Sequence, residues 1–180
     1  MILAALADAL TLSRMGLAAV VAFLIGTGRA QGAAVVLAIA WLTDFLDGRV
    51  AGEASAPTRL GAWDMPADVV LGAGAVVGLG LARELPSWLS ALAVALLGGG
   101  YVALRQPALG MALQGLGYGG TLWLLFANSV PTRGVPVAVA LGIWVSSWSK
   151  FWRVELPEFF RGIAAAARLR RGTSLELTEG

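Results

Sequence analysis

The sequence predicts an all-α integral membrane protein with about six transmembrane helices packed in one bundle. Hydrophobic residues make up 58% of the 180 residues and only 13% are charged, about half of the 25% that is usual in soluble domains. The apolar residues occur in blocks close to the ~20 residues that a helix needs to cross a bilayer. Four aspartates nevertheless lie in one stretch, residues 43–68, beside these blocks. A soluble protein with a large core is therefore disfavoured.

The expected helices follow from the apolar blocks and from the polar, glycine-containing or proline-containing breaks between them. The third helix is expected to begin at Asp64, and Pro66 is acceptable there because early helix N–H groups have no intrahelical partner. The expected spans cover residues 10–26, 33–50, 64–82, 88–104, 108–127 and 137–152. Residues 1–152 are thus expected to form one membrane domain, and residues 153–180 a basic cytoplasmic tail.

The placement of basic residues predicts the orientation in a plasma membrane. Six spans put both termini on one side, and ten of the 13 lysines and arginines fall on that side. The other three, Arg29, Arg83 and Arg133, fall opposite. The positive-inside rule then places both termini and the aspartate stretch at the cytoplasmic face.

Glycine is frequent, with 24 residues, and is concentrated in the third and fifth expected spans. Small residues let membrane helices approach closely. Tight packing within the bundle is the preferred interpretation of these glycines, and a homodimer contact is the alternative.

The four aspartates form two pairs with helical spacing. Asp44 and Asp47 are three residues apart and Asp64 and Asp68 are four apart, so each pair shares a helix face. The short connector predicts neighbouring helices whose pairs face each other across a groove. The chain has no Cys and no His, and carboxylate-only ligation favours hard cations such as Mg2+, Mn2+ or Ca2+. The sequence therefore predicts a metal site at the cytoplasmic end of spans two and three, with water-exposed helix ends as the alternative.

This pattern resembles the signature of the CDP-alcohol phosphatidyltransferase family, D-x2-D-G-x2-A-R-x8-G-x3-D-x3-D. The chain reads Asp44-x2-Asp47-Gly48-x2-Ala51-Gly52-x8-Gly61-x2-Asp64-x3-Asp68. Asp8-x2-Thr11-x2-Arg14 stands where family members often carry N-x2-T-x2-R. Three departures are visible: Gly52 replaces the arginine of the signature, one residue is missing between Gly61 and Asp64, and Asp8 replaces asparagine.

The resemblance implies transfer of a phosphatidyl group from a CDP-linked lipid, such as CDP-diacylglycerol, to an alcohol acceptor, with release of CMP. It implies that two divalent ions, Mg2+ or Mn2+, are bound by Asp44, Asp47, Asp64 and Asp68. It also implies that Asp68 is the general base. The implied substrate-binding positions are Gly48, Gly52 and Thr58. Membrane lipid is a further expected partner, and no nucleic-acid partner is expected.

Two other functions are compatible with the sequence. The first is a family-fold protein with impaired catalysis that serves as a lipid-binding or partner subunit, which Gly52 favours. The second is a small cation transporter, which predicts acidic residues near the middle of several spans. The four aspartates instead lie in one stretch near one face, which argues against a transporter.

Overall fold

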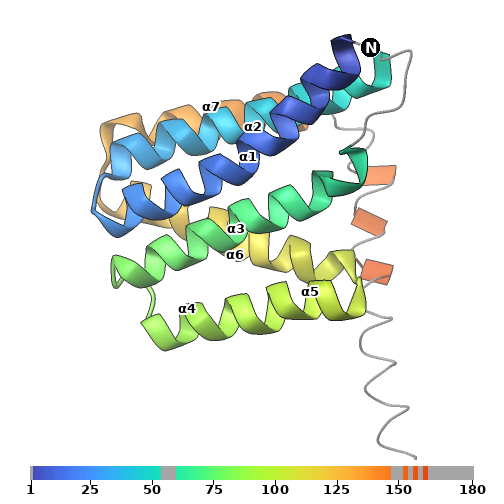
Figure 1. The fold of residues 1–180 in the computed structure, drawn as a ribbon. Coiled ribbons are helices and arrows are strands. Elements are labelled where there is room, and N and C mark those ends of the chain that lie inside the picture. Colours follow the sequence, from blue (N-terminus) through green and yellow to red (C-terminus); the bar gives the residue numbers. More distant parts are fainter. Residues whose placement is uncertain (1, 54–59, 147–151, 154–155, 158–159, 162–180) are drawn as a thin grey trace, which may run out of the picture.

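The computed structural model describes residues 2–53, 60–146, 152–153, 156–157 and 160–161. These residues form helices joined by short turns, without a strand among them (Figure 1). The elements are α1 (Ile2–Gly26), α2 (Ala30–Glu53), η1 (Gly61–Trp63), α3 (Asp64–Leu81), α4 (Ser87–Ala93), η2 (Val94–Gly98), α5 (Gly99–Leu104), α6 (Pro107–Ala127), η3 (Pro131–Arg133) and α7 (Gly134–Ser146). α4, η2 and α5 follow one another directly as a single rod with a π-helical middle. Most of the expected basic tail lies outside the described residues.

A helix stands at each of the six expected positions, and three of them are long and apolar enough to cross a membrane. These three cover Leu3–Gly26, Gly61–Leu81 and Ser87–Leu104. α2 contains a shorter apolar segment, Ala30–Leu46. α1 begins at Ile2, earlier than the expected residue 10, since no helix-breaking residue interrupts the chain between them.

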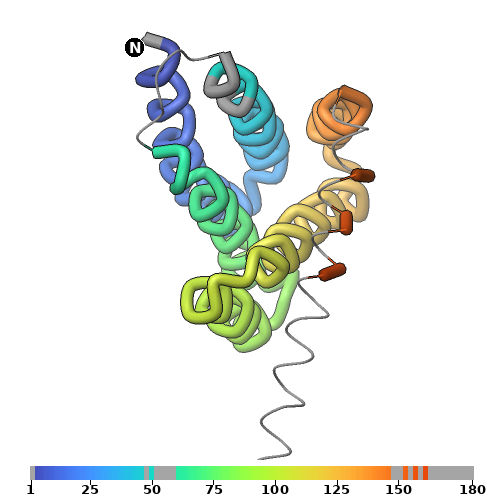
Figure 2. Tube along the Cα trace, turned by 90° about the vertical axis from the view of Figure 1, so that its right-hand side faces the viewer, coloured from blue at the N-terminus to red at the C-terminus, as the bar shows by residue number. Residues whose placement is uncertain are grey.

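The bundle is organised around α3. α3 packs along α1 on one side and along α6 on the other, and the α4–α5 rod also lies against it (Figures 1 and 2). α2 also packs along α1, and α7 packs beside α2. The shared core of α1 and α3 is built from small and branched residues, among them Ala18, Val21, Leu71 and Ala75.

Glycines make these helix contacts close. A Cβ at Gly74 of α3 would lie 2.5 Å from the carbonyl oxygen of Ala18 in α1. A Cβ at Gly117 of α6 would lie 2.5 Å from the carbonyl oxygen of Gly72 in α3. Neither position can hold a larger residue without separating the backbones, so the tight-packing interpretation is confirmed for these glycines.

Candidate active site

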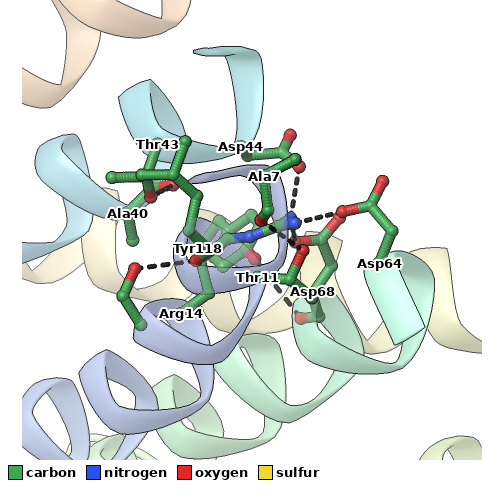
Figure 3. A network of polar contacts seen from close by, with 11 residues as sticks. Ala7, Thr11, Arg14, Ala40, Thr43, Asp44, Asp64, Asp68 and Tyr118 are labelled. Carbon is green, nitrogen blue, oxygen red and sulfur yellow. Dashed lines mark hydrogen bonds and ion pairs between the residues drawn. The ribbon is translucent and has the colours of Figure 1, made fainter. Parts of the chain in front are cut away.

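The centre of the site is Arg14, in the middle of α1. Its side chain is fully enclosed, with 0% exposure. The guanidinium group forms ion pairs with the carboxylates of Asp44 from α2 and of Asp64 and Asp68 from α3 (Figure 3). One cation thus gathers acidic groups from two other helices at a single point.

The three carboxylates differ in their access to solvent. The side chains of Asp44 and Asp64 are 43% and 46% exposed, whereas that of Asp68 is 20% exposed. The carboxylates therefore face the open side of the site, and the guanidinium closes its inner side. Asp68 is the carboxylate closest to the protein interior.

α1 provides the link between the two acidic helices. α2 and α3 each pack extensively against α1, whereas among the described residues they make few or no contacts with each other. Among the described residues, α2 and α3 therefore do not pack closely on each other, and Asp44 faces Asp64 and Asp68 across Arg14 of α1. The aspartate side chains of α2 and α3 reach one another through Arg14 because α1 lies between the two helices.

An aromatic pair borders the site on the side of α6. The Tyr118 hydroxyl lies 3.5 Å from the backbone carbonyl oxygen of Asp68. The ring of Tyr118 packs edge-on against Trp41 of α2, with 5.3 Å between ring centroids. Tyr118 thereby connects α2 with the first turns of α3, where the acidic residues stand.

The start of α3 shows how the shortened signature is accommodated. Gly61–Trp63 forms the short 3-10 helix η1, and Asp64 is the first residue of α3. The missing residue is therefore absorbed before α3 begins. Asp64 and Asp68, one helical turn apart, both reach Arg14 and so lie on one face of α3.

The remaining expected site residues are only partly visible. Asp47, Gly48 and Gly52 belong to α2, but their surroundings fall outside the described part of the structure. Thr58 lies outside the described residues altogether. The structure therefore brings together three of the four expected aspartates and leaves the expected nucleotide contacts as predictions.

Asp8 attaches α1 to the connector that leads into α3. Its carboxylate oxygen accepts a hydrogen bond of 2.8 Å from the backbone N–H of Leu60. Asp8, which replaces the asparagine of the family pattern, thus positions the chain just before η1. An asparagine side-chain oxygen at this position could accept the same hydrogen bond.

Replacing Asp8 by alanine should destabilise the protein by about 1 kcal/mol, because the Leu60 N–H would lose this acceptor. Asp8→Asn should stay close to wild type, since it retains an acceptor oxygen. Thermal unfolding of the purified variants in detergent measures both effects. Equal loss in the two variants would show that the charge of Asp8, and not its hydrogen bond, matters.

Comparison with known proteins identifies the family of this chain. The model of the CDP-alcohol phosphatidyltransferase family matches residues 4–154. The chain belongs to this family. No curated protein and no solved structure matches the chain. The matched region begins in α1 and runs beyond α7, so the family resemblance extends over all six helical rods.

CDP-alcohol phosphatidyltransferases are phosphotransferases of phospholipid biosynthesis that generally depend on divalent metal ions. In the described part of this chain, no group of three or more acidic side chains is arranged to hold a metal ion as it stands. The guanidinium of Arg14 lies among the three carboxylates instead. The donors nevertheless fit such an ion, because carboxylate oxygens are the ligands that Mg2+ and Mn2+ prefer.

Arg14 is the site residue that sequence reasoning undervalued. The sequence placed it only in the family pattern of the first span, Asp8-x2-Thr11-x2-Arg14. A stronger signal was available, because a single arginine inside an apolar membrane helix needs an acidic partner. The four aspartates of the following two helices were candidates for that partner.

Proposed function

We propose that this family member transfers a phosphatidyl group from a CDP-linked lipid, such as CDP-diacylglycerol, to an alcohol acceptor and releases CMP. The observation that carries the proposal is the convergence of Asp44, Asp64 and Asp68 at one buried cation. These are three of the four aspartates of the family signature, and they come together from two separate helices. Exposed helix ends in water would have no reason to converge in this way.

In this proposal Asp68 takes the proton of the acceptor hydroxyl onto a carboxylate oxygen. The hydroxyl oxygen then forms a bond to the lipid-side phosphorus, and the bond between that phosphorus and the CMP oxygen breaks. CMP leaves with the electron pair of the broken bond. The position of Asp68 supports this role, because its side chain is the least exposed of the three, and a partly buried base is shielded from competing water.

Asp44, Asp64 and Asp68, together with Asp47 from the signature, would hold the divalent metal ions, two in number. Such ions would neutralise the negative charge of the diphosphate and of the leaving CMP. Arg14 supplies positive charge to the same carboxylates, so it keeps three like charges together. Gly48, Gly52 and Thr58 are proposed to lie against the nucleotide and its phosphates.

The proposed setting is a multi-pass plasma membrane protein, with both termini and the aspartate site on the cytoplasmic side. The basis is the distribution of lysine and arginine along the sequence. A homodimer remains a proposal. Gly115 and Gly119 of α6 would be its contact, because a Cβ at either position would meet nothing within 4 Å.

One observation favours a second function, a lipid-binding subunit without catalysis. Gly52 removes the arginine of the signature, and the described cation nearest the carboxylates is Arg14. If Arg14 serves only as a permanent counter-ion, the carboxylates would hold the fold together and leave the substrate unreacted. This function predicts binding of a CDP-lipid without turnover.

The two functions are separated by measuring release of CMP from CDP-diacylglycerol by the purified protein. The acceptor panel contains glycerol 3-phosphate, inositol, inositol phosphate and serine, each with Mg2+ and with EDTA. We expect Mg2+-dependent CMP release with one acceptor. Binding of the CDP-lipid without CMP release in the presence of any acceptor would establish the subunit function. Absence of both CDP-lipid binding and CMP release would contradict both functions.

A further inference from the structure

A second feature lies at the end of the bundle opposite the aspartates. A cavity of about 840 Å³ opens where the turns α1–α2, α3–α4 and α6–η3 meet. At 1.5 Å per residue, Asp44 lies roughly 21 Å along α2 from Ala30 at this end. The cavity is therefore separate from the site of the proposed transfer reaction. Its volume is within the range of roughly 300–1,000 Å³ that is typical of ligand pockets.

Three helix ends of the same type build the rim of this cavity. α1, α3 and α6 each close with two crossed backbone hydrogen bonds and a residue of positive φ, the Schellman arrangement. The positive-φ residues are Gly28, Arg83 and Ser129. The outer hydrogen bonds run from Arg29 N–H to Leu24 O, Glu84 N–H to Leu79 O and Val130 N–H to Leu125 O. The chain therefore turns sharply at all three ends and leaves a recess between them.

The charged lining of the cavity is net positive. Arg29, Arg83 and Glu84 all line it, and none of the three forms an ion pair with another described residue. The Arg29 guanidinium lies 5.8 Å from the ring centroid of Phe23, and none of its N–H groups donates a hydrogen bond to another described residue. Gln31 and Asn128 add amide groups to the lining. Two arginines and one glutamate give one net positive charge, which suits one phosphodiester.

The remaining wall is apolar and continues onto the outside of the bundle. Leu24, Leu81 and Leu124 line the cavity, and Leu81 is 65% exposed. Membrane-spanning α1 and α3 end here, at Gly26 and Leu81, so the cavity lies at the level of lipid headgroups. A site with arginines beside an exposed apolar wall matches an amphiphile better than a small soluble anion.

We propose that this cavity binds the phosphate headgroup of an anionic phospholipid from the leaflet at the end opposite the aspartates. Arg29 and Arg83 would donate hydrogen bonds to the phosphate oxygens, and the acyl chains would lie along the exposed apolar surface beside Leu81. The site is independent of the proposed phosphatidyl transfer. Through this site the protein would respond to the content of anionic phospholipid in the leaflet at the end opposite the aspartates.

Native mass spectrometry of the purified full chain in detergent with EDTA tests the proposal, because EDTA suppresses metal-dependent lipid binding at the aspartates. The probes are phosphatidylglycerol, phosphatidylcholine and glycerol 3-phosphate. We expect wild type to retain phosphatidylglycerol preferentially. The Arg29→Gln/Arg83→Gln double variant should bind it at least about tenfold more weakly, because it loses two charge-assisted contacts.

Arg133→Gln is the matched control. Arg133 lies at the same end and also faces a phenylalanine ring, with its guanidinium 5.7 Å from the ring centroid of Phe126, but it is not among the residues lining the cavity. Glu84→Gln provides a test that does not depend on the folding of the double variant, since it should strengthen phosphatidylglycerol binding. Unchanged binding in both the double variant and Glu84→Gln would overturn the proposal. If glycerol 3-phosphate bound to the cavity as tightly as phosphatidylglycerol and displaced it, the proposal would also be overturned, because the cavity would then be a site for soluble anions.

Discussion

Replacing Asp68 by asparagine should lower the rate of CMP release by roughly 10²–10⁴-fold, the usual contribution of a general base. Asparagine has nearly the same volume and keeps one acceptor oxygen, but it cannot take the proton of the acceptor hydroxyl. Asp68 is the least exposed of the three carboxylates around Arg14, so water should replace it poorly as a base. Binding of the CDP-lipid should be largely retained.

Asp44→Asn is the matched comparison for Asp68→Asn. Both changes remove one negative charge that is paired with Arg14, so both perturb the stability of the site in the same direction. We expect Asp44→Asn to raise the Mg2+ concentration needed for turnover, because Asp44 is proposed as a metal ligand only. Turnover and CDP-lipid binding are measured in parallel over a Mg2+ series. Wild-type activity in Asp68→Asn would remove the general-base assignment.

Replacing Arg14 by glutamine should destabilise the protein by about 2–4 kcal/mol in the absence of metal. Removing one partner of a buried ion pair commonly costs about 3–5 kcal/mol, and the partial exposure of Asp44 and Asp64 reduces that cost. The three carboxylates would then repel one another without a nearby cation. Thermal unfolding in detergent with EDTA measures the loss.

Arg14→Lys and added Mg2+ supply the controls for this prediction. Lysine retains the positive charge but lacks the planar fork that can reach several carboxylates at once, so its stability should be intermediate. Mg2+ should raise the unfolding temperature of Arg14→Gln more than that of wild type, because the carboxylates of the variant lack the guanidinium as a cation. Wild-type stability of Arg14→Gln in EDTA would show that the ion pairs do not support the fold.

The sequence by itself determined the helical membrane architecture, the family and the acidic residues of the site. These features are local in sequence. Apolar blocks of spanning length predict helices wherever they occur, and the spacing of Asp64 and Asp68 places both on one face of any helix. The same retained spacing favours a connector, and not α3, that absorbs the residue missing between Gly61 and Asp64.

Only the tertiary structure decided how these pieces meet. The sequence favoured direct packing of the two acidic helices because a short connector joins them, but α1 lies between α2 and α3 and supplies Arg14 to both. The cavity beside Arg29 and Arg83 likewise needs three helix ends that are distant in the chain. The physical reason is the same in both cases. Apolar membrane helices have similar surfaces, so their neighbours depend on close contacts such as Gly74 against Ala18, which no local pattern specifies.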